Sequence, residues 1–114
     1  MDLLPNIQKE QKDITPLVGM GLTEYVGSDR YTFTVVKVLT PNRIIVKEDN
    51  VKVVKGTWYD GNVEVEYELG ENSPEIKLYR TRDKRCWKRV GSGSESYTPQ
   101  FYLGYRSYYQ DPSF

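Results

Sequence analysis

Short runs of alternating apolar and polar residues, separated by turn residues, make up most of the chain from residue 16 onward. The run LVGMGLTEYV at 17–26 is followed by the turn residues GSD and by the β-branched run YTFTVVKVLT at 31–40. A tight turn, TPN, with proline at its second position, leads into RIIVKED at 43–49. Two β-branched runs joined by so short a turn predict a β-hairpin.

The same pattern continues toward the C-terminus. Residues 50–61 end in Asp60-Gly61, a strong turn dipeptide, and residues 62–70 alternate apolar side chains with glutamates. This alternation predicts a half-buried strand with an acidic outer face. Two more strands are predicted at 75–82 and 85–90, with a turn between them at Asp83-Lys84. The sequence GSGSES at 91–96 predicts a flexible loop.

The order of predicted elements is nearly all strand, with short connections and no internal repeat. It predicts a mainly β protein, either a small antiparallel sheet or a partly open SH3-like barrel. The 114 residues suit one domain, residues 1–114. Within it we expect an N-terminal arm or short helix at 1–15, a β core at 16–96 and an aromatic tail at 97–114.

Composition bears on chemistry. The chain has no histidine, which is the commonest general base near neutral pH and the commonest transition-metal ligand. Its single cysteine, Cys86, excludes an internal disulfide. No run approaches the roughly 18 apolar residues of a membrane span, and the start lacks the order of a signal peptide. We therefore expect a cytoplasmic binding protein that is not an enzyme, with no metal, cofactor or membrane partner.

Charge is balanced overall but unevenly distributed. The net charge of zero argues against nucleic acid as a partner. Residues 60–75 hold six acids and no base, whereas residues 76–90 hold seven bases and one acid. If these blocks form adjacent strands, they pair across the ladder. Alternatively, the basic block, which includes Arg82, uses arginine and an exposed ring of Tyr79 or Trp87 to hold a nucleotide.

Two further segments carry candidate binding residues. Asp29 is the last residue of the GSD turn and Arg30 follows it. Arg30 is either a solvated strand start or a loop arginine that clamps a phosphate, and the spacing favours the first. The tail at 97–114 holds five tyrosines and two phenylalanines around Arg106. It forms either the last strand of its own core or an arm on a second copy. We expect the second, a two-fold homodimer with Arg106 near its interface.

Three segments resemble a known family in the same order along the chain. They are VGMGLTEYVGSDRYTFTVVKV at 18–38, KLYRTRDKRCWKRVGSG at 77–93 and LGYRSYYQDPSF at 103–114. They are similar to the first family of Thoeris anti-defence proteins, the phage-encoded Tad sponges. The resemblance implies a protein that binds the immune signal glycocyclic ADP-ribose in the cytoplasm of an infected bacterium, without cleaving it. Cyclic oligonucleotides are a further ligand class in that family.

The resemblance also implies a pocket between two protomers. Its residues in this sequence would be Arg30 and Arg106, which hold the pyrophosphate, and Tyr79, which stacks on the adenine. Asp29, Tyr105, Tyr108, Arg82 and Trp87 are the expected neighbours of these three residues. The RDKRC run before Trp87 departs from the family pattern, and residues 50–73 do not match it. The alternative is a small-barrel module that binds nucleic acid or inhibits a host defence protein.

Overall fold

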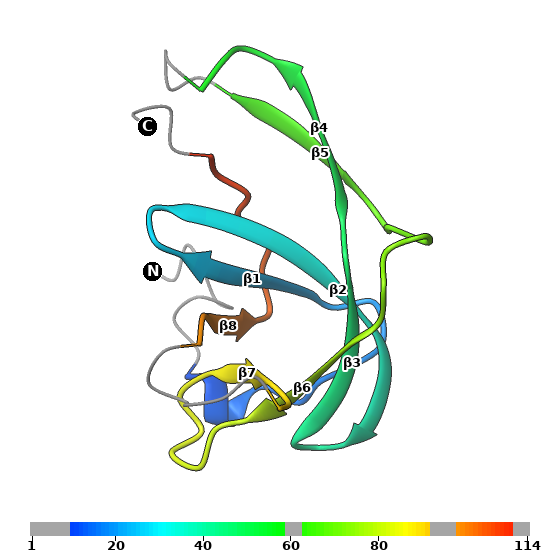
Figure 1. Ribbon diagram of the computed structural model, residues 1–114, viewed down its shortest axis with the longest axis vertical. Helices are drawn as coiled ribbons and strands as arrows, with labels where there is room; N and C mark the ends of the chain where they lie inside the picture. The colour runs from blue at the N-terminus through cyan, green and yellow to red at the C-terminus, as the bar shows by residue number, and fades with distance from the viewer. Residues whose placement is uncertain (1–9, 59–62, 92–97, 111–114) are drawn as a thin grey trace, which may run out of the picture.

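The computed structural model describes residues 10–58, 63–91 and 98–110. Within these residues, six antiparallel strands form a closed barrel in the order β1-β2-β3-β6-β7-β8, and two more form a separate two-stranded ribbon. The ribbon projects from one end of the barrel (Figure 1). The predicted mainly β class is therefore confirmed, and the barrel is closed rather than partly open.

The described part of the chain forms one short 3-10 turn and eight strands. A 3-10 turn, η1, comes first, and the strands alternate with short connections. Their bounds are η1 Gln11–Asp13, β1 Gly21–Val26, β2 Asp29–Thr40, β3 Arg43–Glu48, β4 Asn50–Lys55, β5 Glu64–Glu68, β6 Ile76–Arg80, β7 Trp87–Arg89 and β8 Gln100–Leu103. The predicted turn at Asp60-Gly61, residues 92–96 of the predicted loop, and the chain ends at 1–9 and 111–114 lie outside the described residues.

The predicted hairpin is confirmed as β2 and β3, joined at Pro41 and Asn42. Proline presets the backbone for the turn, and the Asn42 N–H donates to the Thr40 hydroxyl at 3.1 Å. The long β2 has register shifts between Val35 and Lys37 and again toward Thr40. Such bulges bend a strand, so β2 can curve around the barrel and pair with both β1 and β3.

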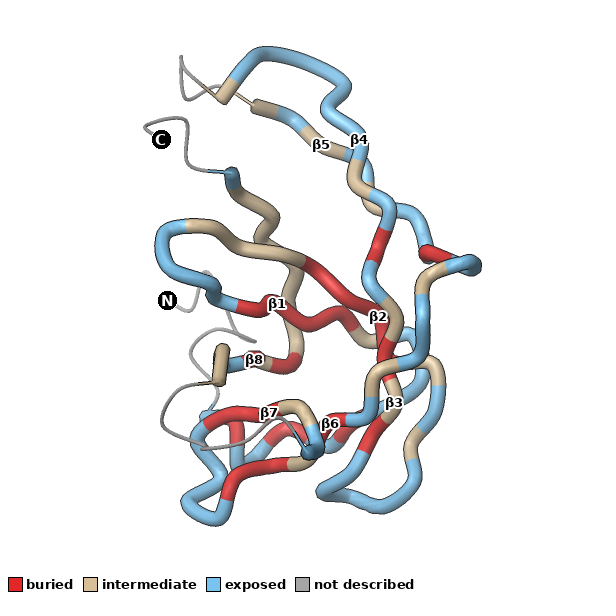
Figure 2. Tube along the Cα trace, viewed as in Figure 1, coloured by how far each residue is buried: buried red, intermediate tan, exposed pale blue. Residues whose placement is uncertain are grey.

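All six strands contribute buried side chains to the barrel interior, and Figure 2 marks the buried residues along these strands in red. Alternate positions of each strand point inward, because side chains alternate across a strand. Phe33 and Phe101 pack edge to face with ring centroids 5.1 Å apart. The fully buried apolar side chains are Leu22, Phe33, Val35, Ile44, Val46, Leu78, Trp87, Phe101 and Leu103.

Strand β8 of the C-terminal tail closes the barrel, so this part of the tail is the last strand of the chain's own core, while the homodimer stays a prediction. β8 pairs with β1 over four positions and with β7 at Trp87 and Phe101. Phe101 and Leu103 of this strand are thus part of the chain's own core. The 3-10 turn supports this strand, because the Gln11 amide accepts from the Leu103 N–H at 2.7 Å and donates to the Leu103 carbonyl at 3.0 Å.

The ribbon shows that the acidic and basic blocks are not adjacent strands, which excludes one of the two alternatives for their charges. β5 pairs with β4, where Glu66 faces Lys52, and not with the basic strand β6. β4 follows directly from β3 and continues beyond the barrel, and β5 returns antiparallel along β4. A tight turn then separates β5 from β6. Gly70 permits this turn, because a Cβ there would overlap the Glu48 carbonyl oxygen.

Candidate functional site

The structure gives both predicted phosphate-binding arginines a role in holding the tail. Arg30 exchanges backbone hydrogen bonds with Tyr109, at 2.8 and 3.0 Å. Its Nε donates to the Ser107 carbonyl at 2.9 Å, and its guanidinium lies 4.8 Å from the centre of the Tyr109 ring. These contacts place the tail beside the start of β2. Among the side-chain donors of Arg30, Nε alone donates a hydrogen bond within the described residues.

Arg106 occupies a more buried position. Its Nε donates to the Asp49 carboxylate at 3.0 Å, and its Nη2 donates to the Thr34 hydroxyl at 2.8 Å. The Asp49 side chain is only 1% exposed and also accepts from Thr34 at 2.5 Å. Gly21 leaves room for the guanidinium, because a Cβ there would lie 2.6 Å from Arg106 Cγ. Arg106 thus fixes the tail to the junction of β3 and β4.

Asp29 and Tyr108 lie in an aromatic cluster between the barrel and the ribbon. Tyr108 packs against Tyr31, with centroids 6.1 Å apart, and against Trp58, with centroids 5.7 Å apart. Its backbone N–H donates to the Tyr67 hydroxyl on β5 at 3.1 Å. Burial, and then the negative charges of Glu48 and Asp29, raise the pKa of Tyr108. The structure therefore brings Asp29, Arg30, Arg106 and Tyr108 together around the tail.

Tyr79 lies elsewhere on the barrel. It belongs to β6, which stands three strands from β1 in either direction around the closed order. Its ladder neighbours are Arg43 on β3 and Lys88 on β7. A single chain therefore does not bring Tyr79 to the two arginines.

The prediction that Trp87 offers an exposed ring is wrong. Its side chain has 0% exposure and fills the barrel, because its position on β7 points inward. The Arg80 guanidinium lies 4.7 Å from its ring centre and donates to the carbonyls of Gln11, Ile14 and Pro41. Arg80 therefore has a structural role, because its guanidinium joins the 3-10 turn and the β2–β3 turn to the barrel. Arg82 is exposed at the start of the β6–β7 turn.

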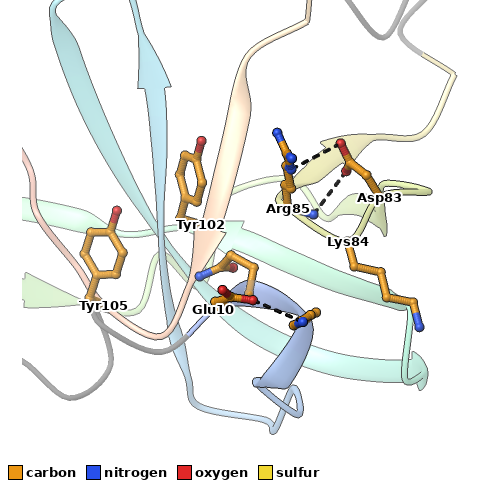
Figure 3. Close-up of a pocket in the computed structure, with 8 residues that line it drawn as sticks. Glu10, Asp83, Lys84, Arg85, Tyr102 and Tyr105 are labelled. Carbon is orange, nitrogen blue, oxygen red and sulfur yellow. Dashed lines mark hydrogen bonds and ion pairs between the residues drawn. The ribbon is translucent and has the colours of Figure 1, made fainter.

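A cleft of about 600 Å³ opens between the 3-10 turn, the β6–β7 turn and the segment that follows β8 (Figure 3). We call it the tyrosine–cation cleft. A smaller cavity of about 410 Å³ lies beside it and shares Asp83, Arg85 and Tyr102. The cleft is lined by Glu10, Gln11, Lys12, Asp83, Lys84, Arg85, Tyr102 and Tyr105.

One wall of the cleft is the rigid turn between β6 and β7. Asp83 accepts from the Thr81 hydroxyl at 2.7 Å and from the Arg85 N–H at 3.1 Å. The hydrogen bond from Thr81, followed by that from Arg85, lowers the pKa of Asp83. Lys84 has a φ of 59°, a left-handed conformation that is costly for a side-chain-bearing residue. The turn thereby presents the Lys84 and Arg85 side chains on its outer surface.

The opposite wall is made of tyrosines. Tyr102 and Tyr105 stand across the cleft from Arg85 and Lys84 (Figure 3). Tyr25 supports both rings, because its ring meets Tyr102 edge-on at 5.4 Å and its hydroxyl lies 2.8 Å from the Tyr105 hydroxyl. Burial and the hydrogen bond to Tyr25 raise the pKa of Tyr105. The Tyr105 hydroxyl therefore stays protonated at neutral pH.

The cleft offers cations and ring faces to a ligand. Arg85 is loosely paired with Asp83 at 3.9 Å, and Lys12 with Glu10 at 3.3 Å, all well exposed. Such exposed pairs exchange readily for a phosphate. Sequence reasoning placed Arg85 in the basic block and Tyr102 in the tail, but only the closure of the barrel by β8 brings the two together. Over the residues that the structure describes, no three histidine, cysteine or acidic side chains form a metal-binding group.

Together, the fold and the cleft define a small closed β barrel with a polar cleft of small-molecule size. Comparisons with protein-family models, curated proteins and solved structures find no match to this chain. In the described part of the chain, no helix has the length and apolar character needed to cross a bilayer.

Proposed function

We propose that this protein binds a cyclic nucleotide signal and sequesters it without cleaving it. The observation that carries the proposal is the tyrosine–cation cleft, in which Tyr102, Tyr105, Lys84 and Arg85 line one cavity of about 600 Å³. The resemblance to the Tad sponges suggests that the ligand is glycocyclic ADP-ribose. It also suggests that the protein is phage-encoded and inhibits Thoeris immunity in the bacterial cytoplasm.

Several features of the cleft support this proposal. Its volume lies within the roughly 300–1,000 Å³ of small-molecule sites. Stacking of a base on a tyrosine contributes about 1–3 kcal/mol, and a hydrogen bond from a charged group about 1.5–3 kcal/mol. Cleavage would need a general base, and the two acids of the cleft, Glu10 and Asp83, are paired with Lys12 and Arg85, while Asp83 also accepts from Thr81. Such a wall favours binding over proton transfer.

The resemblance suggests a second location for the same ligand, between two protomers. Arg30 and Arg106 of one copy would meet Tyr79 of another, which suits the distance between these residues within one chain. A guanidinium has five N–H donors. Within the described residues the side chain of Arg30 uses Nε and that of Arg106 uses Nε and Nη2. Donors therefore remain on each arginine for a phosphate.

Calorimetry with glycocyclic ADP-ribose tests both the function and its location. Wild type should bind one ligand per site, and the double variant Lys84→Ala with Arg85→Ala should bind at least about tenfold more weakly, because it loses two charged contacts. Lys55→Ala, an exposed change on the ribbon, is the matched control. Heat-denatured complex should release the ligand chemically intact.

The outcomes separate the function from the site. Absence of binding by wild type, or recovery of a cleaved product, would refute the sponge. Full binding by the double variant with loss in Tyr79→Ala would instead move the ligand to the pocket between protomers, because Tyr79 is not among the residues that line the cleft. Tyr79 is the better discriminator than Arg106, whose replacement also disturbs the fold through Asp49.

A further inference from the structure

The outer face of β3, β6 and β7 gathers cations around a ring. Ile44, Val46 and Leu78 point into the core, so the residues between them point outward. The register sets Tyr79 directly between Arg43 on β3 and Lys88 on β7. Residues that face each other across neighbouring strands have Cβ atoms about 4.5–5.5 Å apart, so the three side chains form one row.

A second row lies beside the first. Lys37 on β2 faces Ile45 on β3, which in turn faces Lys77 on β6. Lys37, Arg43 and Lys77 are exposed, while Tyr79 is half-buried. Lys88 is only 5% exposed, and its ammonium donates to the Thr98 carbonyl at 2.9 Å, so the cations that this face offers to a ligand are Lys37, Arg43 and Lys77. The outer ladder positions of β3, β6 and β7 hold no acidic residue.

The protein's zero net charge conceals this surface. Three of the sixteen acids, Glu64, Glu66 and Glu68, stand on β5, where they pair with β4 in the ribbon beyond the barrel. Figure 1 shows that the ribbon projects from the end of the barrel opposite to the β6–β7 turn. Interactions between exposed charges are largely screened beyond roughly 8–10 Å, so the face of β3 and β6 acts locally as a basic surface.

We propose that this face binds single-stranded nucleic acid, with a base stacked on Tyr79 and phosphates contacted by Arg43, Lys37 and Lys77. A basic surface alone would suit any polyanion. A ring held in the same row as a cation matches a strand in which a base and a phosphate alternate, and sheet faces of small barrels bind single strands in this way. An acidic peptide supplies no planar group for the ring.

Fluorescence anisotropy of a labelled oligothymidine strand tests the proposal. Binding should weaken with salt, with a slope of log K against log salt concentration near −2, because each phosphate contact contributes about −0.7 and three cations take part. Tyr79→Ala should weaken binding about fivefold or more through lost stacking, and Tyr79→Phe should keep wild-type affinity. Lys77→Glu should weaken binding and flatten the slope, whereas Lys55→Glu on the ribbon should leave both unchanged.

The proposal fails if the strand does not bind at low salt, or if Tyr79→Ala and Lys77→Glu bind as wild type does. It also fails if polyglutamate competes as well as oligothymidine, since the surface would then recognise charge alone. Circular dichroism melts of each variant confirm that the barrel is folded, so that a lost affinity reports the surface and not the core.

Discussion

Replacement of Arg106 by alanine should destabilise the protein markedly, whatever its effect on a ligand. The change removes the cation from Asp49, whose side chain is 1% exposed, and one hydrogen bond from Thr34. Breaking a buried ion pair from one side costs about 3–5 kcal/mol. Arg106 itself is 29% exposed, so water can enter the space it leaves. We therefore expect a loss of about 3 kcal/mol in the free energy of unfolding.

Urea unfolding followed by tryptophan fluorescence measures this loss, because Trp87 is fully buried in the folded barrel. Arg82→Ala is the matched control, since Arg82 is exposed and its replacement should change stability by less than about 0.5 kcal/mol. In the Arg106→Ala background, Asp49→Asn should recover part of the loss, because it removes the uncompensated buried charge.

Two results would refute this reasoning. One is an Arg106→Ala protein within about 0.5 kcal/mol of wild type, which would mean that Asp49 is solvated despite its burial. The other is strict additivity of Asp49→Asn and Arg106→Ala, since contacting residues with a shared network should couple by about 0.5–3 kcal/mol. Either result would return Arg106 to the simpler role of a ligand-binding side chain.

Three further predictions address the turn, the arm and the barrel interior. Gly70→Ala should cost about 1–3 kcal/mol in urea unfolding, because its Cβ overlaps the Glu48 carbonyl and the backbone must shift; an unchanged midpoint would contradict this. Gln11→Ala should cost about 1–3 kcal/mol, since the buried Leu103 N–H loses its acceptor, and faster amide exchange at Leu103 should report it. Burial raises the pKa of Glu24 above 4.5, so the folded state binds that proton more tightly than the unfolded chain. The unfolding free energy should therefore fall as pH rises through the window above 4.5, and Glu24→Gln should flatten that slope, with an unaltered slope in the variant arguing against it.

Local sequence features predicted the strands well. The turn at Pro41 and Asn42 and the turn at Gly27 are encoded in neighbouring residues, so the strands on either side of each follow from the chain itself. The pairing of β5 could not be chosen from charge, because opposite charges allow either a β4 or a β6 partner, and the structure has β4. The choice depends on chain connectivity and on the tight turn at Gly70, which charge counting does not consider.

The candidate site was less predictable for a related reason. The cleft joins Tyr102 from the last strand to Arg85 from the β6–β7 turn, and this proximity exists only after the barrel closes. Trp87 and Tyr79 looked alike in the sequence, each an aromatic residue among arginines. Strand parity separates them, since the first points inward and the second outward, and an error of one residue in a strand's register reverses that assignment.

Closure by β8 also has a consequence for how the protein is made. Tyr25 and Tyr105, whose hydroxyls meet beside the cleft, are 80 residues apart in the chain. During synthesis, β1 therefore leaves the ribosome long before the strand that completes its sheet, and its free edge is exposed for several seconds at about 5–20 residues per second. The β2–β3 hairpin can form in that interval, but the core around Phe101 cannot. This order favours a late, concerted closure of the barrel, in which the binding cleft and the folded state arise in the same step.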